Sequence, residues 1–405
     1  MFCRISVFLS GALSLFVLSA PLALSVGAGE SDPRQMPPPR PLIDGRQVFE
    51  AKGCVRCHAV RDGAAAVRVG PDLARSGSWN DVMQFTASLW NHNPAMTAKM
   101  REQGIERPPV SPEDMGKLVP YLFAVKFFDE PGNAEHGRQL FEQRSCAHCH
   151  QLGGRGGRVG PRLDELKEFM SPSFLAQGLW NHGPDMAAKM ADEKVERPRL
   201  EPGDVSDIVA YIRGDTPGAA VLDLAYAQAG SPQAGQALFT QKGCSHCHAI
   251  AGVGGTVGPD LGVQRPQEHV GEMAAGLWNH GPRMWAKMKE LGRPVPKLAD
   301  TEMADLLAYL YFVQYMGQAG NASRGRELFR EKACGGCHTA GGEGNKGAKD
   351  LTASSAVRSP FSWAAAVWNH PVDSEKTGEA LATATFGDDE MRDLVAFLGS
   401  PGGAK

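Results

Sequence analysis

The sequence predicts a mainly α-helical protein built of four tandem small domains. Three observations support this prediction. The motif C-x-x-C-H occurs four times, with first cysteines at Cys54, Cys146, Cys244 and Cys334. A G-x-x-x-F pattern precedes each motif, and an apolar segment with an aromatic residue closes each repeat. Successive motifs are about 90 to 100 residues apart, a fair size for one small domain, so each repeat is expected to be one domain.

The C-x-x-C-H motif is the attachment signature of c-type haem. Two thiols add across the vinyl groups of the porphyrin, and the adjacent histidine coordinates the iron from one face. The sequence therefore predicts four covalently bound haems c, each with one iron. The attachment residues are Cys54, Cys57, Cys146, Cys149, Cys244, Cys247, Cys334 and Cys337, and the proximal axial ligands are His58, His150, His248 and His338.

Structural disulfides, a zinc site and a C-x-x-C redox pair are the other interpretations of these cysteines. Disulfides do not require a histidine after every second cysteine. Zinc sites pair C-x-x-C units or add further ligands at set distances, and a thioredoxin-like motif occurs once, near a strand. Four copies in matching surroundings favour haem. The remaining cysteine, Cys3, lies in a segment that is expected to be removed.

The composition is that of an ordinary soluble globular protein. The 405 residues are 42% hydrophobic and carry a formal net charge of −3. A near-neutral charge gives no support to nucleic-acid binding, so no nucleic-acid partner is expected.

Residues 1–28 are expected to form a signal peptide. Arg4 supplies a weak positive region, an apolar run covers residues 5–26, and Val26-Gly27-Ala28 fits a small-residue cleavage site. An uncleaved membrane anchor is the alternative, because the run is about long enough to span a bilayer. Serines and Pro21 interrupt the run and favour cleavage. We therefore expect a periplasmic or otherwise exported bacterial protein, which contacts a membrane only if this segment is retained.

Residues 29–41 are rich in proline and predict a stiff, exposed tether. Four repeats follow at residues 42–128, 134–214, 231–317 and 321–400, and they are called repeats 1 to 4. Repeat 4 is the divergent copy. The segments between the repeats are rich in glycine, proline and small residues, which is typical of linkers.

Each repeat is expected to begin and end with a helix. In the opening helix a glycine and a phenylalanine four residues apart share one face, and the glycine lets another backbone approach closely. These pairs are Gly45 and Phe49, Gly137 and Phe141, Gly235 and Phe239, and Gly325 and Phe329. We expect the opening helix to pack against the closing helix, whose apolar runs start at Leu118, Ile208, Leu306 and Leu394. Pro120 is expected to kink the first closing helix.

A short turn follows the haem motif. It reads Gly70-Pro71-Asp72-Leu73, Gly160-Pro161-Arg162-Leu163 and Gly258-Pro259-Asp260-Leu261 in repeats 1–3. Repeat 4 has Gly347-Ala348-Lys349-Asp350-Leu351, without the proline.

This order of motifs resembles class I c-type cytochromes, repeated four times, over nearly the whole chain after residue 41. The resemblance implies four tandem cytochrome c-like helical domains, each wrapped around one covalently bound haem and exposing mainly one haem edge. It also implies that the carbonyl of the turn proline holds the proximal histidine ring, a role that falls to Pro71, Pro161 and Pro259. The missing proline puts this support in doubt in repeat 4.

The sixth ligand of each iron has more than one candidate. Every repeat contains a W-N-H stretch, and two methionines follow in repeats 1–3 at helical spacing, so all three side chains share one helix face. The candidates are Met96, Met100 or His92 in repeat 1, Met186, Met190 or His182 in repeat 2, and Met284, Met288 or His280 in repeat 3. The resemblance favours methionine, the usual sixth ligand of class I cytochromes.

An internal comparison favours histidine instead. Repeat 4 keeps Trp368-Asn369-His370 but has Ser374 and Gly378 at the methionine positions. On this interpretation the methionines pack in the core. For repeat 4, His370 is the first candidate, with Lys376 or an open site as alternatives. The tryptophans of these stretches are expected to be core residues beside the haem.

These features predict a tetrahaem c-type cytochrome that transfers single electrons between redox partners, and not an enzyme, so no catalytic residue is predicted. The expected partners are redox proteins or a membrane oxidoreductase. Two alternatives stay open. One is a haem enzyme, peroxidase-like or acting on a small molecule, that uses an open fourth haem. The other is a cytochrome subunit of a membrane oxidoreductase complex.

Overall fold

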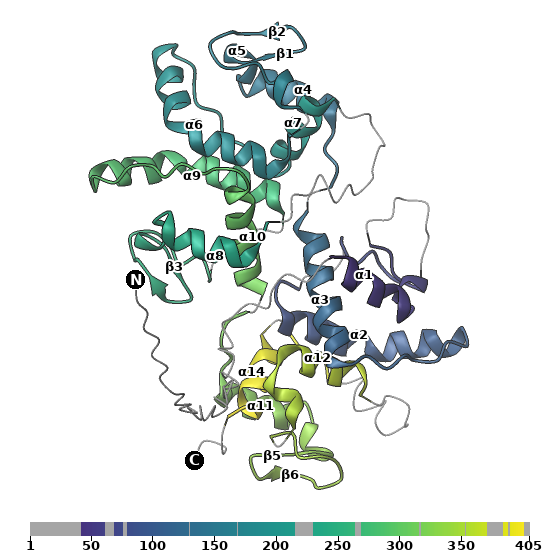
Figure 1. Ribbon diagram of the computed structural model, residues 1–405. Coiled ribbons are helices and arrows are strands. Elements are labelled where there is room, and N and C mark those ends of the chain that lie inside the picture. Colours follow the sequence, from purple (N-terminus) through teal and green to yellow (C-terminus); the bar gives the residue numbers. More distant parts are fainter. Residues whose placement is uncertain are drawn as a thin grey trace, which may run out of the picture. The chain divides into compact units, whose positions relative to one another are not determined.

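The computed structural model describes residues 42–60, 69–75, 79–128, 130–167, 169–214, 230–263, 269–315, 317–352, 354–370, 384–387 and 389–400. The predicted signal peptide and tether, and the candidate Lys376, lie outside these residues. The described chain is mainly helical, with three two-stranded hairpins (Figure 1). The prediction of a mainly α-helical fold is confirmed.

Each repeat has the same order of helices. The opening helices are α1 (Leu42–Ala51), α4 (Ala134–Gln143), α8 (Pro232–Gln241) and α11 (Ala322–Glu331). The haem motif begins in a single helical turn: η1 (Cys54–Arg56), α5 (Cys146–Cys149), η3 (Cys244–His246) or η4 (Cys334–Gly336). Two further turns, η2 (Asp164–Leu166) and η5 (Ser355–Arg358), precede the third helices of repeats 2 and 4.

The third helix carries the whole W-N-H stretch in repeats 1–3 and ends at its Trp in repeat 4, and the last helix closes each repeat. The third helices are α2 (Val82–Glu102), α6 (Pro172–Asp192), α9 (Val270–Glu290) and the much shorter α12 (Pro360–Trp368). The closing helices are α3 (Pro112–Phe127), α7 (Asp204–Arg213), α10 (Glu302–Tyr315) and α14 (Glu390–Leu398). α3 continues through Pro120, so this proline does not end the helix.

Side chains at the helix starts satisfy backbone N–H groups that have no partner within the helix. The Asp81 carboxylate accepts hydrogen bonds from the amides of Met83 and Gln84 at the start of α2. Ser171 accepts from Phe174 at the start of α6. These polar residues directly precede apolar segments, so the third helices begin where the sequence changes from turn to helix.

The opening helix of each repeat packs against its closing helix, as predicted. The glycine of the opening helix makes this contact close: a Cβ atom on Gly137 would lie 1.9 Å from the carbonyl oxygen of Asp207. The neighbouring aromatic rings also meet, with ring centroids 5.6 Å apart for Phe141 and Tyr211. Repeats 1, 3 and 4 pair Phe49 with Tyr121, Phe239 with Tyr309 and Phe329 with Phe397.

In the described chain a small antiparallel hairpin follows the haem motif in repeats 2–4, and it was not among the elements predicted from the sequence. The hairpins are β1 (Gln151–Leu152) with β2 (Arg155–Gly156), β3 (Ala249–Ile250) with β4 (Val253–Gly254), and β5 (Thr339–Ala340) with β6 (Glu343–Gly344). Both central residues of each two-residue turn have positive φ, for example 59° at Gly153 and 76° at Gly154, as a two-residue hairpin turn requires. The first strand begins directly after the proximal histidine.

The third helices make their largest helix–helix contacts with a partner repeat. α6 packs against α9, and α2 packs against α12 (Figure 1). Gly183 and Gly281 lie where α6 and α9 meet, and a Cβ atom on either would lie within 3 Å of the Trp285 ring. Repeats 2 and 3 therefore form one pair, and repeats 1 and 4 form another.

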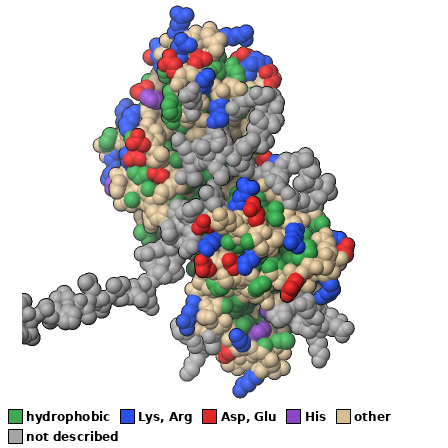
Figure 2. Space-filling model, turned by 45° about the vertical axis from the view of Figure 1, so that its right-hand side comes forward, with side chains coloured by type: hydrophobic (Ala, Val, Ile, Leu, Met, Phe, Trp, Pro, Cys, Tyr) green, Lys and Arg blue, Asp and Glu red, His purple; other side chains and the backbone are tan. Residues whose placement is uncertain are grey.

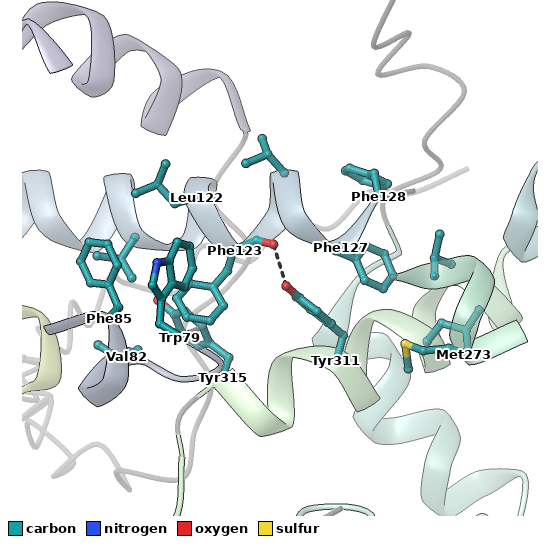
Figure 3. Packing of buried hydrophobic residues seen from close by; sticks show 14 of the residues in the cluster. Trp79, Val82, Phe85, Leu122, Phe123, Phe127, Phe128, Met273, Tyr311 and Tyr315 are labelled. Carbon is teal, nitrogen blue, oxygen red and sulfur yellow. Dashed lines mark hydrogen bonds between the residues drawn. The ribbon is translucent and has the colours of Figure 1, made fainter. Parts of the chain in front are cut away.

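Repeats 1 and 3 also meet, through aromatic residues of their closing helices. The Tyr311 hydroxyl of α10 donates a 2.8 Å hydrogen bond to the carbonyl of Phe123 in α3 (Figure 3). The rings of Phe123 and Tyr315 pack edge to face with centroids 4.4 Å apart. This cluster connects the pair formed by repeats 1 and 4 with the pair formed by repeats 2 and 3.

Among the described residues, no helix combines the length and the apolar character needed to cross a membrane. Lys and Arg side chains are interspersed with Asp and Glu side chains on the face shown in Figure 2. This distribution matches the small net charge of −3.

Candidate haem sites

Each C-x-x-C-H motif is held as one compact turn. The residue before the first cysteine has positive φ in all four repeats: Gly53 at 73°, Ser145 at 61°, Gly243 at 80° and Ala333 at 57°. The amide of the proximal histidine then donates to the carbonyl of the first cysteine, at 2.9 to 3.0 Å in every copy. Two cysteines and one histidine are thereby fixed on one turn, which suits attachment to one edge of a rigid ring.

A backbone carbonyl orients the imidazole of every proximal histidine. Nδ1 lies 3.0 Å from the Pro71 carbonyl in His58, 3.0 Å from that of Pro161 in His150, and 2.9 Å from that of Pro259 in His248. In repeat 4, Nδ1 of His338 lies 2.8 Å from the Lys349 carbonyl. With Nδ1 as donor, Nε2 keeps its lone pair for a metal. The contact expected from the resemblance is present, and repeat 4 makes it without proline because any residue supplies a carbonyl.

A glycine packs against the ring of the proximal histidine in repeats 1–3. A Cβ atom on Gly70, Gly160 or Gly258 would lie 2.4 Å from Cε1 of the histidine in the same repeat. Ala348 takes this place in repeat 4, because its amide donates to the carbonyl of Cys337 as that of Gly70 donates to Cys57. The proximal side of repeat 4 therefore accommodates one methyl group that the others exclude.

The first thiol of each motif is shielded from water, and all of the motif thiols are unpaired. Burial raises the pKa of the first cysteine of each motif, Cys54, Cys146, Cys244 and Cys334, to about 11. All eight motif cysteines are free of disulfides. In the described chain, no group of three or more His, Cys, Asp or Glu side chains is arranged to hold a metal ion. The donor set that each repeat offers, two thiols and one oriented imidazole, fits haem c.

The far end of each long third helix lies beside the haem motif of its own repeat. Gln103, directly after α2, has its Oε1 atom 4.0 Å from Sγ of Cys57. Arg293, shortly after α9, has Nη1 3.0 Å from Nδ1 of His246 within the third motif. The half of the helix that carries the methionines therefore runs across the haem-binding side of the repeat.

The structure places both kinds of sixth-ligand candidate on that half of the helix in repeats 1–3. Met96, Met100, Met186, Met284 and Met288 are half-buried and contact the apolar core, and Met190 is half-buried. His92, His182 and His280 are exposed. Nδ1 of His92 bonds the Ser88 carbonyl and that of His280 bonds the Gly276 carbonyl, both at 2.8 Å.

The proximal histidine of repeat 1, His58, has a lowered pKa. Burial lowers the pKa of His58, the Pro71 carbonyl raises it, and the charge of His92 lowers it further. His92 therefore lies close enough to interact with the proximal histidine of the same repeat.

In repeat 4 the rings of the proximal histidine and of His370 lie close together. The rings of His338 and His370 have centroids 6.2 Å apart and are inclined by 59°. Metal–imidazole bonds are about 2 Å long, so two imidazoles on opposite sides of one metal ion have ring centres roughly 6 Å apart. The observed separation fits an iron between the two rings.

The Trp and Asn of every W-N-H stretch bind the partner repeat, a role that sequence reasoning missed. Trp180 Nε1 donates to the carbonyl of Pro296 at 2.9 Å. The Asn181 side chain donates to the Leu298 carbonyl at 2.7 Å and accepts from its amide at 2.9 Å. We call this set of three hydrogen bonds the Trp–Asn contact.

The Trp–Asn contact is reciprocal and occurs four times. Trp278 and Asn279 bind Pro198 and Leu200 of repeat 2; Trp90 and Asn91 bind Ala384 and Phe386 of repeat 4; Trp368 and Asn369 bind Pro108 and Val110 of repeat 1. The retention of Trp-Asn in all four repeats was the available signal. A second pattern accompanies it, because three of the partner segments read Pro-x-Leu or Pro-x-Val: Pro108–Val110, Pro198–Leu200 and Pro296–Leu298.

A family model described as cytochrome c matches residues 42–126, 134–215, 232–313 and 322–401. An 88-residue segment is 30% identical to cytochrome c oxidase subunit 2 of Alkalihalophilus pseudofirmus. That match covers 20% of this chain and 25% of the relative, so the chain spans about a quarter of that protein's length. No solved structure matches the chain. Each of the four matched ranges contains one C-x-x-C-H motif.

Proposed function

Since the chain belongs to the cytochrome c family, we propose that it is an exported tetrahaem protein that passes single electrons between redox partners. Its four cytochrome c domains carry covalently bound haem c, one per domain. Haem c supplies reversible one-electron chemistry of its iron. The chain supplies attachment, orientation and shielding from water. The observation that carries the proposal is the fourfold proximal site, in which every imidazole is oriented by a backbone carbonyl.

We infer methionine as the sixth ligand in repeats 1–3. The methionine half of the helix runs beside the attachment cysteines, as the contact of Gln103 with Cys57 indicates. The imidazoles of His92 and His280 are turned back toward carbonyls one helical turn earlier. The experiment below separates methionine ligation from the histidine alternative.

We infer His370 as the sixth ligand in repeat 4. Its ring lies opposite that of His338 at a distance that fits one iron between them. Methionine ligation raises the haem potential relative to a second histidine. The protein then has three haems of higher potential and one of lower potential. A filled sixth position in repeat 4 argues against the peroxidase-like alternative, which needs an iron that is open to substrate.

The first test is an optical spectrum of the purified holoprotein, with carbon monoxide added to the reduced form. We expect the weak red charge-transfer band of methionine-ligated ferric haem, and no reaction with carbon monoxide. Met186→Ala and Met190→Ala form a matched pair, and only the variant that removes the ligand should lose part of this band. His182→Ala should retain the whole band. Absence of the band from the wild type would contradict methionine ligation, and absence of covalent haem would contradict the proposed function itself.

Export and partner are the finer parts of the proposal. Sequencing the N-terminus of the mature protein tests export, and we expect it to start after Ala28. A redox protein or a membrane oxidoreductase is the proposed partner, and the similarity of one segment to a cytochrome c oxidase subunit supports the second class. An N-terminus that retains residues 1–28 would instead favour an anchored subunit of a membrane complex.

A further inference from the structure

The third helix of repeat 4 is shorter than the third helices of the other repeats. The third helices α2, α6 and α9 each have 21 residues, whereas α12 has nine and ends at Trp368. His370 therefore comes after the end of its helix. In repeats 1–3 the histidine and both methionines lie within the helix, so the backbone hydrogen bonds of the helix fix their positions. His370 instead follows the end of α12, where its amide donates to the Val367 carbonyl at 3.3 Å.

Repeat 1 binds the chain on both sides of this position. Before His370, the Asn369 side chain donates to the Val110 carbonyl at 2.6 Å and accepts from the Val110 amide at 3.1 Å. Arg107 donates to the Trp368 carbonyl at 3.1 Å and stacks over the Trp368 ring. At Ala384, where the described chain resumes, the carbonyl accepts a 2.6 Å hydrogen bond from Trp90.

The Trp90 ring touches the ligand itself. It packs edge-on against His370 with centroids 5.3 Å apart, and against Phe386 at 5.8 Å. Trp90 is thus placed between the two ends of the repeat 4 segment that carries the sixth ligand. The equivalent residue in the other pair, Trp180, has the Trp285 ring as its neighbour, at 6.2 Å.

We propose that Trp90 of repeat 1 is a positioning residue that holds His370 on the iron of haem 4. The coordination of one haem then depends on a neighbouring domain. This inference rests on the proposed function and on His370 as the sixth ligand. The length of α12, the hydrogen bonds that flank His370 and the ring contact of Trp90 support it independently.

The test compares full-length holoprotein carrying Trp90→Leu, Trp90→Phe or His370→Ala, with Trp180→Leu as the matched control in the other pair. The readouts are haem content, the electron paramagnetic resonance spectrum of the ferric protein, and the fraction of ferrous haem that binds carbon monoxide. Wild type should bind none. His370→Ala should open one of the four haems. Trp90→Leu should give a carbon monoxide-reactive fraction that approaches that of His370→Ala, with loss of one low-spin ferric signal.

The controls should behave differently. Trp90→Phe keeps an aromatic edge against His370 and should remain closed, and Trp180→Leu should leave all four haems closed because α9 holds the distal side of repeat 3. If Trp90→Leu lowers the haem content, the Asn369→Ala protein is measured in its place. This change releases the chain beside His370 without altering the contact between the Trp90 and His370 rings. Partial opening is expected there too.

Two results would overturn the proposal. One is a closed haem 4 in Trp90→Leu and Asn369→Ala while His370→Ala opens it. The other is equal opening in Trp90→Phe and Trp90→Leu, because the ring contact would then not position the ligand. An unchanged spectrum in His370→Ala would remove the ligand assignment on which the proposal rests, and missing covalent haem would remove the proposed function.

Discussion

The proximal histidine of repeats 1–3 leaves no room for a methyl group on the neighbouring glycine. A Cβ atom on Gly258 would lie 2.4 Å from Cε1 and 2.6 Å from Nδ1 of His248. The imidazole is therefore fixed from two directions, by the glycine against its face and by the Pro259 carbonyl at Nδ1. Repeat 4 has Ala348 at this place, so the orientation of His338 depends more on the Lys349 carbonyl.

Gly258→Ala should displace the His248 ring and weaken its bond to the iron of haem 3. Overpacking of this kind costs about 1 to 3 kcal/mol of stability. We expect an unchanged haem content, because the thioether bonds remain, and a changed electron paramagnetic resonance signal for one haem. Ala348→Gly in repeat 4 is the control and should change the spectrum little. A Gly258→Ala protein with the wild-type spectrum and stability would contradict this account of the site.

The packing of opening against closing helix depends on one glycine in each repeat. In repeat 1, a Cβ atom on Gly45 would lie 2.2 Å from Cβ of Tyr121 and 2.5 Å from the Lys117 carbonyl oxygen. The contact is between backbones, so it cannot be relieved by rotating a side chain. The Phe49 and Tyr121 rings beside it depend on the same separation of the two helices.

Gly45→Ala and Gly116→Ala should have opposite effects on the stability of repeat 1. Gly45→Ala forces α1 away from α3, and we expect a loss of about 1 to 3 kcal/mol in the free energy of unfolding. Gly116 lies within α3 with no atom near the position of a Cβ, so alanine should stabilise the helix by about 0.5 to 1 kcal/mol. Thermal unfolding of the two holoproteins checks both signs, and equal shifts would refute the helix-contact explanation.

The whole molecule is organised by the Trp–Asn contacts, which pair repeat 2 with repeat 3 and repeat 1 with repeat 4. A buried ion pair supports the second pair: Arg392 of α14 lies 2.5 Å from the carboxylate of Asp81, which also caps α2. Each Asn side chain satisfies an N–H and a C=O of the partner segment. Removing it leaves both groups without these partners, which is more costly than the loss of two ordinary hydrogen bonds.

Asn279→Ala should weaken the pair of repeats 2 and 3 and leave the pair of repeats 1 and 4 intact. The amide of Leu200 loses its acceptor, and we expect a destabilisation of about 1 to 3 kcal/mol. Hydrogen exchange at Leu200 should therefore accelerate by about tenfold or more. The Val110 amide, which makes the same contact with Asn369, is the internal reference. Equal acceleration at both amides would show that the two pairs are not independent.

The sequence was most informative where a local pattern determines the structure. The C-x-x-C-H spacing, the Gly and Phe of the opening helix and the apolar closing helix each act over a few residues, so their consequences could be predicted. The absence of a proline equivalent to Pro161 predicted weaker support for His338. The structure uses the carbonyl, which Lys349 also has.

Contacts between distant repeats could not be predicted in the same way. The Trp–Asn contact joins residues such as Asn91 and Phe386, which are 295 positions apart. Its acceptors are backbone groups, and the Pro-x-Leu or Pro-x-Val pattern that three of the partner segments share does not indicate which repeat binds which. The sixth ligand was ambiguous for a related reason. His, Met and Met lie on one helix face, and the position of the helix relative to the haem decides among them.

The pairing of the repeats is nested along the chain, since the adjacent repeats 2 and 3 lie between the two members of the outer pair. Synthesis proceeds from repeat 1 to repeat 4, and domains fold as units as they emerge. Repeats 2 and 3 can associate as soon as repeat 3 has been synthesised, whereas repeat 1 can bind its partner only after repeat 4 has been synthesised. Until then the hydrogen-bonding groups of Trp90 and Val110 lack their partners in repeat 4. A chain that stops before repeat 4 therefore contains the completed pair of repeats 2 and 3. It also exposes the surface of repeat 1 that repeat 4 covers, and this exposed surface distinguishes an incomplete molecule from a complete one.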